Sequence, residues 1–265
     1  MESDSFALIA CTSQYFHNYR HVSNALSMYH AARKLGLPDS RIVLMIGGAI
    51  PCDPRNAAPA HIYNSADRRV DLYPPDVQVD YSGAEVTVQS FLAVLTDRLP
   101  AGTPASRRLQ SGPRSRVLVY LAGHGGDQFL KFRDHQELTS AELGAAFEQM
   151  AAAHRCAELL LLVDTCQAAT LAAPLIEAAG NAWAVPAPRL VSLASSALGE
   201  NSYSLEADET LGVALSDRFT FHVHRFLNAL IPEAIPSSTS QLHEVRGGIA
   251  CYRTGWDAMG CDGMG

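Results

Sequence analysis

The residues Leu159-Leu160-Leu161-Leu162-Val163 run directly into Asp164-Thr165-Cys166-Gln167. Five consecutive apolar residues predict a strand that is buried on both faces, so the acid, the hydroxyl and the thiol stand where that strand ends. The thiol of Cys166 is therefore a candidate reactive group. A cysteine after a buried strand is more often an inert small hydrophobic residue, so its position alone does not make it catalytic.

A second stretch has the same pattern. The apolar residues 117–121 are followed by Ala122-Gly123-His124-Gly125-Gly126, which places an imidazole between glycines just past another buried strand. A thiol and an imidazole form a nucleophile and base pair, in which the histidine holds the thiol proton and later delivers it to a leaving amine. The N–H groups of Gly125 or Cys166 can supply an oxyanion hole, so the pair predicts acyl transfer through a thioester.

Strands and helices alternate along the rest of the chain. This alternation predicts an α/β fold with an open, mostly parallel sheet that is covered by helices on both faces. Ligands bind such sheets at the carboxyl ends of the strands, where we expect His124, Cys166, Ser195 and Ser196 to converge. The expected strands cover residues 6–11, 41–46, 117–121, 159–163 and 189–194, the expected helices residues 22–35, 88–99, 139–150 and 219–230, and a hairpin arm residues 129–132.

Composition limits the possible functions. The 265 residues, 48% of them hydrophobic, suit one large domain, which we place at residues 1–231, followed by a tail at 232–265. A net charge of -7 without charged blocks argues against a protein held on nucleic acid or on an anionic membrane. Six cysteines are too few for a disulfide framework, and no stretch is long enough to span a bilayer or to act as a secretory signal.

Many short segments carry a resemblance that covers roughly residues 6–230. In their order along the chain, they resemble the catalytic subunits of GPI-anchor transamidases, a family of legumain-type cysteine peptidases. The resemblance implies a caspase-like fold, with Cys166 as nucleophile, His124 as general base and acid, and Asn18 orienting the histidine. The segments are residues 11–13, 18–22, 37–45, 54–56, 79–81, 85–88, 123–126, 129–132, 147–150 and 164–167.

The resemblance also implies a reaction and its participants. The thiol would cleave the C-terminal GPI attachment signal of a precursor protein, and the ethanolamine amine of a GPI lipid would capture the acyl group. The partners would be the other transamidase subunits, the precursors and the lipid, in a complex on the lumenal side of the endoplasmic reticulum membrane. Two alternatives remain open, namely a legumain-like endopeptidase that uses water as acceptor, and a non-catalytic scaffold of the same fold.

Several further residues match family positions. Ser195 and Ser196 match the strand end that lines the substrate pocket, although both suit a turn equally well, and Gly125 is expected to bind substrate through its N–H. Cys52 matches a cysteine that forms a disulfide with another subunit. The chemistry needs no cofactor, but Asp39, the Ile42 carbonyl and Asp80 match a structural calcium site, in which Gln78 stands where an acidic ligand is expected.

Overall fold

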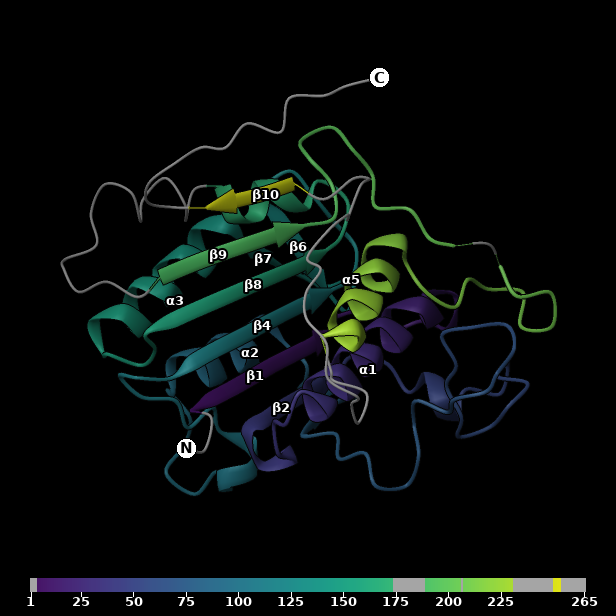
Figure 1. Cartoon of the computed structure of the whole chain (residues 1–265), viewed down its shortest axis with the longest axis horizontal. Coiled ribbons are helices and arrows are strands. Elements are labelled where there is room, and N and C mark those ends of the chain that lie inside the picture. The colour runs from purple at the N-terminus through teal and green to yellow at the C-terminus, as the bar shows by residue number, and fades with distance from the viewer. Residues whose placement is uncertain (1–3, 174–188, 206, 231–249, 254–265) are drawn as a thin grey trace, which may run out of the picture.

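The computed structural model describes residues 4–173, 189–205, 207–230 and 250–253 (Figure 1). Within these residues a seven-stranded sheet has the order β10-β9-β8-β4-β1-β2-β3. Its neighbouring strands pair in parallel, except for the antiparallel pair of β10 and β9, so the predicted mostly parallel α/β fold is confirmed. The strands are β1 (Ser5–Cys11), β2 (Ile42–Ile46), β3 (Tyr81–Ser82), β4 (Arg116–Ala122), β8 (Glu158–Asp164), β9 (Arg189–Ala194) and β10 (Ala250–Arg253).

Two helical layers cover the sheet. Helices α1 (Tyr19–Lys34) and α5 (Arg218–Ala229) pack on one face, and α2 (Val88–Thr96) and α3 (Ser140–Ala152) pack on the other. Successive residues of β1 point to opposite faces, so Leu8 joins the core under α2 and α3 while Ile9 joins the core under α1. Burial on both faces explains why the central strands are continuous apolar runs.

A small second sheet follows the histidine. It consists of β5 (Gly125–Gly126), β6 (Phe129–Phe132) and β7 (Gln136–Thr139), which confirms the predicted hairpin arm. Helix α3 then begins with a capping box, in which the Thr139 hydroxyl accepts a hydrogen bond from the Glu142 N–H. The arm therefore connects His124 to the helix that leads back into β8.

The structure contains elements that the sequence pattern did not predict. Residues 168–173 are helical, so a helix begins directly after the Cys166 turn. Strand β10 extends the sheet edge from within the predicted tail, most of which lies outside the described residues. None of the described helices has the length and apolar character needed to cross a bilayer.

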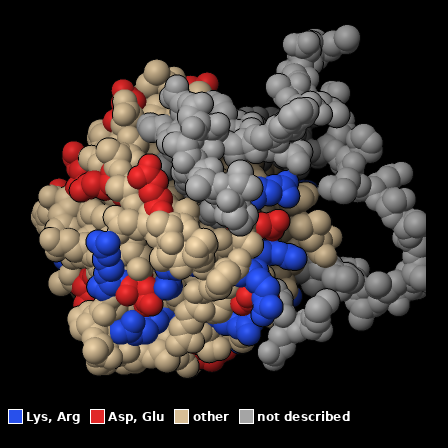
Figure 2. Space-filling model, turned by 90° about the vertical axis from the view of Figure 1, so that its left-hand side faces the viewer, with Lys and Arg blue, Asp and Glu red and all other residues tan. Residues whose placement is uncertain are grey.

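Figure 2 shows the edge of the sheet at which the parallel strands begin. Basic and acidic side chains are interspersed there, and Glu158 lies 3.6 Å from the guanidinium of Arg116 and 3.8 Å from that of Arg189. The described residues of this face therefore form no broad basic surface of the kind that binds a nucleic-acid backbone.

Candidate active site

The register of two central strands places His124 and Cys166 at the same edge of the sheet. Ala122 at the end of β4 pairs with Asp164 at the end of β8, and each candidate residue lies two positions further along its strand. The Gly123 N–H donates to the Asp164 carbonyl over 3.3 Å, which extends the pairing beyond the strands. Ala194 pairs with Val163, so Ser195 and Ser196 leave the sheet beside the same turn.

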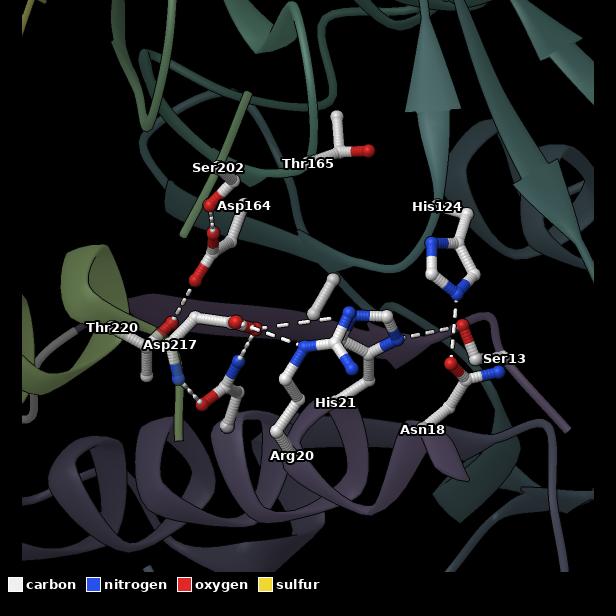
Figure 3. Close-up of polar contacts among 12 residues, drawn as sticks. Ser13, Asn18, Arg20, His21, His124, Asp164, Thr165, Ser202, Asp217 and Thr220 are labelled. Atoms are coloured by element: carbon white, nitrogen blue, oxygen red, sulfur yellow. Dashed lines mark hydrogen bonds and ion pairs between the residues drawn. The ribbon is translucent and has the colours of Figure 1, made fainter. Parts of the chain in front are cut away.

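Asn18 orients the imidazole of His124 (Figure 3). The His124 Nε2 lies 2.7 Å from the Asn18 Oδ1, and Asn18 is buried in the 3-10 turn that precedes α1. Because an amide oxygen only accepts, Nε2 carries the proton and the lone pair of the neutral ring lies on Nδ1. Burial, together with the charge of Arg20, lowers the pKa of His124, which favours this neutral form. The ring is thus prepared to accept a proton through Nδ1.

Replacing Asn18 by Ala is expected to lower kcat by about 10- to 100-fold, the equivalent of about 1.5–3 kcal/mol for a hydrogen bond to a charged group. The loss arises because nothing then fixes the His124 tautomer or stabilises the imidazolium. Asn18→Asp is the matched control, since it keeps an acceptor at the same place. Steady-state kinetics that show equal losses in both variants would contradict the orienting role.

Ser195 and Ser196 fix the turn that carries Cys166. The Ser195 hydroxyl accepts from the Thr165 N–H over 3.1 Å and donates to the Thr165 carbonyl over 2.9 Å. The Ser196 hydroxyl donates to the same carbonyl over 2.8 Å and accepts from the Ala168 N–H over 3.2 Å. These hydroxyls hold protein backbone at both ends of the turn, and a direct role of the serines in substrate binding stays a prediction.

Cys166 is half-buried in this turn, directly before the helical residues 168–173. A helix N-terminus carries partial positive charge, which favours the negative charge of a thiolate. Gln167, in a left-handed conformation with φ 53°, donates its N–H to the Glu200 carbonyl and accepts from the Gly199 N–H. The turn is therefore held from both sides, as a positioned nucleophile requires.

The loop that contacts Gln167 presents apolar side chains to solvent. Leu198 is 66% exposed and Tyr203 is 63% exposed. The same loop is anchored beneath the site, because the Ser202 hydroxyl donates to the Asp164 carboxylate over 2.7 Å. The two residues that anchor the loop, Asp164 and Gln167, lie on either side of Cys166 in the sequence. The loop therefore forms one rim of the site.

A buried polar cluster beside His124 was not predicted from the sequence (Figure 3). The Arg20 guanidinium pairs with Asp217 over 3.0 Å, and the Asn24 amide donates to Asp217 over 2.6 Å. The His21 ring stands edge-on to the His124 ring, with their centroids 5.0 Å apart. Burial and the nearby Asp164 carboxylate raise the pKa of Asp217 to about 7. The sequence identified Asp164 at a strand end but gave no signal for Asp217.

The other cysteines differ from Cys166. Cys11 and Cys156 are buried, and burial raises the pKa of their thiols to about 12 and about 11, so both stay protonated. Cys52 is exposed in the 3-10 turn Ile50–Cys52 and is a free thiol in the single chain. Its exposure is compatible with the predicted disulfide to another chain, which stays a prediction.

The predicted calcium ligands are only partly arranged as a site. The Asp39 carboxylate accepts from the Tyr29 hydroxyl over 2.7 Å, and the Asp80 carboxylate accepts from the Leu44 N–H over 2.9 Å. Burial, reinforced by the charge of Asp39, raises the pKa of Asp80 to about 6, so the two carboxylates repel each other. Among the described residues, no group of three or more His, Cys, Asp or Glu side chains could hold a metal. Calcium binds six to eight oxygens. Asp39 and Asp80 therefore supply suitable ligands for calcium but only part of a full set.

Comparisons with known proteins test the predicted resemblance. The "GPI-anchor transamidase" of Bos taurus is 43% identical over 252 residues, which are 95% of this chain and 61% of the bovine protein. The protein of the same name from Schizosaccharomyces pombe is 43% identical over 85% of this chain and 57% of its own length. The "Putative GPI-anchor transamidase" of Caenorhabditis elegans is 41% identical over 90% of this chain and 71% of its own length.

The chain thus spans about 61% of the length of the mammalian relatives that it matches. A crystal structure of caspase-1 from Spodoptera frugiperda is similar with a TM-score of 0.44 and 11% identity, and the match covers 86% of this chain and 70% of the caspase. The model of the Peptidase C13 family matches residues 5–230, which include His124 and Cys166 together with the sheet that brings them to one edge. The predicted resemblance is confirmed, and the chain belongs to the peptidase C13 family.

Proposed function

We propose that this chain is the catalytic part of a GPI-anchor transamidase. The observation that carries the proposal is the Asn18–His124 hydrogen bond at the strand edge beside Cys166, in a chain whose curated relatives bear that name. Such an arrangement supports cysteine-dependent acyl transfer. We take the acceptor to be the ethanolamine amine of a GPI lipid, as the family resemblance implies.

The geometry supports two half-reactions. In the first, His124 Nδ1 takes the thiol proton, the Cys166 sulfur attacks the peptide carbonyl, and the C–N bond breaks as His124 protonates the leaving amine. In the second, His124 takes a proton from the incoming ethanolamine amine, which attacks the thioester and releases the thiolate. The N–H groups of Gly125 and Cys166 stabilise the oxyanion in both steps. The product is an amide that joins the precursor to the lipid.

The test is complementation followed by product analysis. Cells that lack their own catalytic subunit receive this chain, within the full length of a relative where its remaining segments are needed. A GPI-anchored reporter at the cell surface and a lipid amide on its C-terminus are the expected products. Release of a reporter with a free C-terminal carboxylate would instead identify a legumain-like endopeptidase, since water is then the acceptor.

A non-catalytic scaffold is distinguished by its chemistry. A peptide-directed electrophile should label Cys166 faster than Cys11, Cys52, Cys156, Cys251 and Cys261, because Cys166 follows the strand that brings it to the same sheet edge as the oriented imidazole of His124. Equal labelling of Cys166 and the exposed Cys52 would favour the scaffold. Mass spectrometry of the labelled peptides gives the comparison.

We further propose that the chain works in a complex with other transamidase subunits on the lumenal side of the endoplasmic reticulum membrane, where precursor and lipid meet. The exposed thiol of Cys52 supports a covalent link to one subunit. Cys52→Ser should remove the corresponding band from a non-reducing gel while the purified chain keeps its fold. An unchanged band would place the link elsewhere.

We also propose a weak structural calcium site at Asp39, the Ile42 carbonyl and Asp80. Calcium would relieve the repulsion between the two carboxylates, so millimolar calcium is expected to raise Tm of the purified chain. Asp80→Asn should remove this increase, whereas Asp76→Asn should keep it. Calorimetry that shows no calcium-dependent shift in the unaltered chain would exclude the site.

A further inference from the structure

Two threonine side chains pack against the glycines on either side of His124. A Cβ atom on Gly123 would collide with the Thr12 Oγ1, and a Cβ atom on Gly125 would lie 2.6 Å from the Thr165 Oγ1 and 3.2 Å from its Cγ2. The threonines thus occupy the space that larger residues at these positions would need. Each threonine side chain therefore lies against the backbone of a glycine next to His124.

The two hydroxyls differ in their hydrogen bonding. The Thr12 Oγ1 donates to the Lys131 carbonyl over 2.6 Å. The Thr165 Oγ1 is buried and has no hydrogen-bond partner among the described residues, and Thr165 as a whole is only 2% exposed. Figure 3 shows Asp164 directed toward Thr220, while the Thr165 side chain stands apart from the hydrogen-bonded cluster. An unpaired buried hydroxyl is destabilising and therefore requires an explanation.

The backbone beside this hydroxyl is a candidate oxyanion donor. The Lys131 N–H donates to the His124 carbonyl over 2.7 Å, and Gly125 pairs with Leu130. This pattern puts Gly125 in a non-hydrogen-bonded position, so its N–H points away from β6 and is free for a substrate oxygen. Thr165 precedes Cys166 in sequence and contacts Gly125 in space, so it connects the two N–H donors of the oxyanion hole.

We propose that Thr165 is a positioning residue, whose hydroxyl gains its missing hydrogen bond when a substrate carbonyl draws the Gly125 peptide toward Cys166. An acceptor lies beside Gly125. The Phe129 carbonyl oxygen is 2.6 Å from the position of a Gly125 Cβ, the same distance as the Thr165 Oγ1, so both oxygens border the same small space next to Gly125. The new bond holds the Gly125 N–H on the developing oxyanion. This inference rests on the proposed acyl transfer by Cys166.

Three substitutions separate the hydroxyl from the packing. Thr165→Val removes only the hydroxyl, Thr165→Ser removes only the methyl group, and Thr165→Ala removes both. With a peptide substrate and hydroxylamine as acceptor, the Val and Ala variants are expected to lose about tenfold in kcat at unchanged KM, which corresponds to about 1.4 kcal/mol. The Ser variant should stay near the unaltered chain. An active Val variant beside impaired Ser and Ala variants would show that the side chain acts by packing, which overturns the proposal.

The rate at which iodoacetamide alkylates Cys166 measures the reactivity of the thiol in a reaction that forms no oxyanion. The Val variant is expected to react at the same rate as the unaltered chain, because no N–H donor assists alkylation. Slower alkylation would mean that Thr165 acts on the thiol and would also overturn the proposal. Thr12→Val is the matched control, since it loses a hydrogen bond that already exists and should lower Tm.

A failure of the proposed acyl transfer by Cys166 would give a different experimental result from a failure of the Thr165 proposal. Turnover that survives Cys166→Ala would contradict acyl transfer by Cys166, whatever the Thr165 variants do. If the unaltered chain turns over no substrate, the affinity for a peptide aldehyde replaces kcat as the readout, because the aldehyde forms a tetrahedral adduct with the thiol. The Val variant should then bind it about tenfold more weakly, and equal binding would contradict the proposal.

Discussion

Replacing Cys166 by Ala is expected to abolish acyl transfer, with a fall in kcat on the order of 10³-fold or more. The hydroxyls next to Cys166 are not placed to replace its sulfur as nucleophile. The Thr165 side chain is buried behind Gly125, and the hydroxyls of Ser195 and Ser196 are hydrogen-bonded to the nucleophile turn. Without the thiol the covalent intermediate cannot form, and neither an amine nor water can receive the acyl group.

The measurement is reporter attachment in cells together with single-turnover cleavage by the purified protein. Cys156→Ala is the matched control, because burial keeps that thiol protonated in the core, and this variant should retain activity. Binding of precursor to the Cys166→Ala variant should persist, since the rim loop is unchanged. Residual attachment above background in this variant would exclude Cys166 as the nucleophile.

The fold was largely predictable because burial on both faces leaves a strong local pattern. The strands β1, β2, β4 and β8 contain continuous apolar runs, β9 is interrupted only by Ser192, and all five strands end within a residue or two of their predicted bounds. The same pattern predicted which residues meet at the carboxyl edge, since parallel strands in register bring His124 and Cys166 to one level. For these strands the local sequence is therefore enough to predict where each strand ends and which residues follow it.

The polar cluster beside His124 was not predictable, because it depends on contacts between distant segments. Arg20 and Asp217 are 197 positions apart, and no spacing or pattern in the sequence links the two. The roles of Ser195 and Ser196 depended likewise on side-chain direction, which the sequence of a strand end does not specify. Such sites combine residues whose local sequence favours no particular partner.

Replacing His124 by Gln is the second change with a large expected effect. Gln is similar in size and can keep a contact with Asn18, but it cannot take the thiol proton or return it to the leaving amine. General acid–base catalysis contributes typically about 10²- to 10⁴-fold, so kcat should fall by that factor while substrate binding is retained. A KM that stays constant beside the fall in kcat would show that the loss lies in the chemical step.

The pH dependence gives an independent test of the same residue. His124 accepts the thiol proton only when it is neutral, so activity is lost as the pH falls through the pKa of its ring. Burial lowers the pKa of His124 from its usual 6.5, so the acidic limb of kcat/KM should lie below pH 6.5. The His124→Gln variant should lack this limb, because glutamine does not titrate. An acidic limb that persists unchanged in this variant would assign the titration to another group, and Asp217, with its pKa raised to about 7, would then be the first to test by Asp217→Asn.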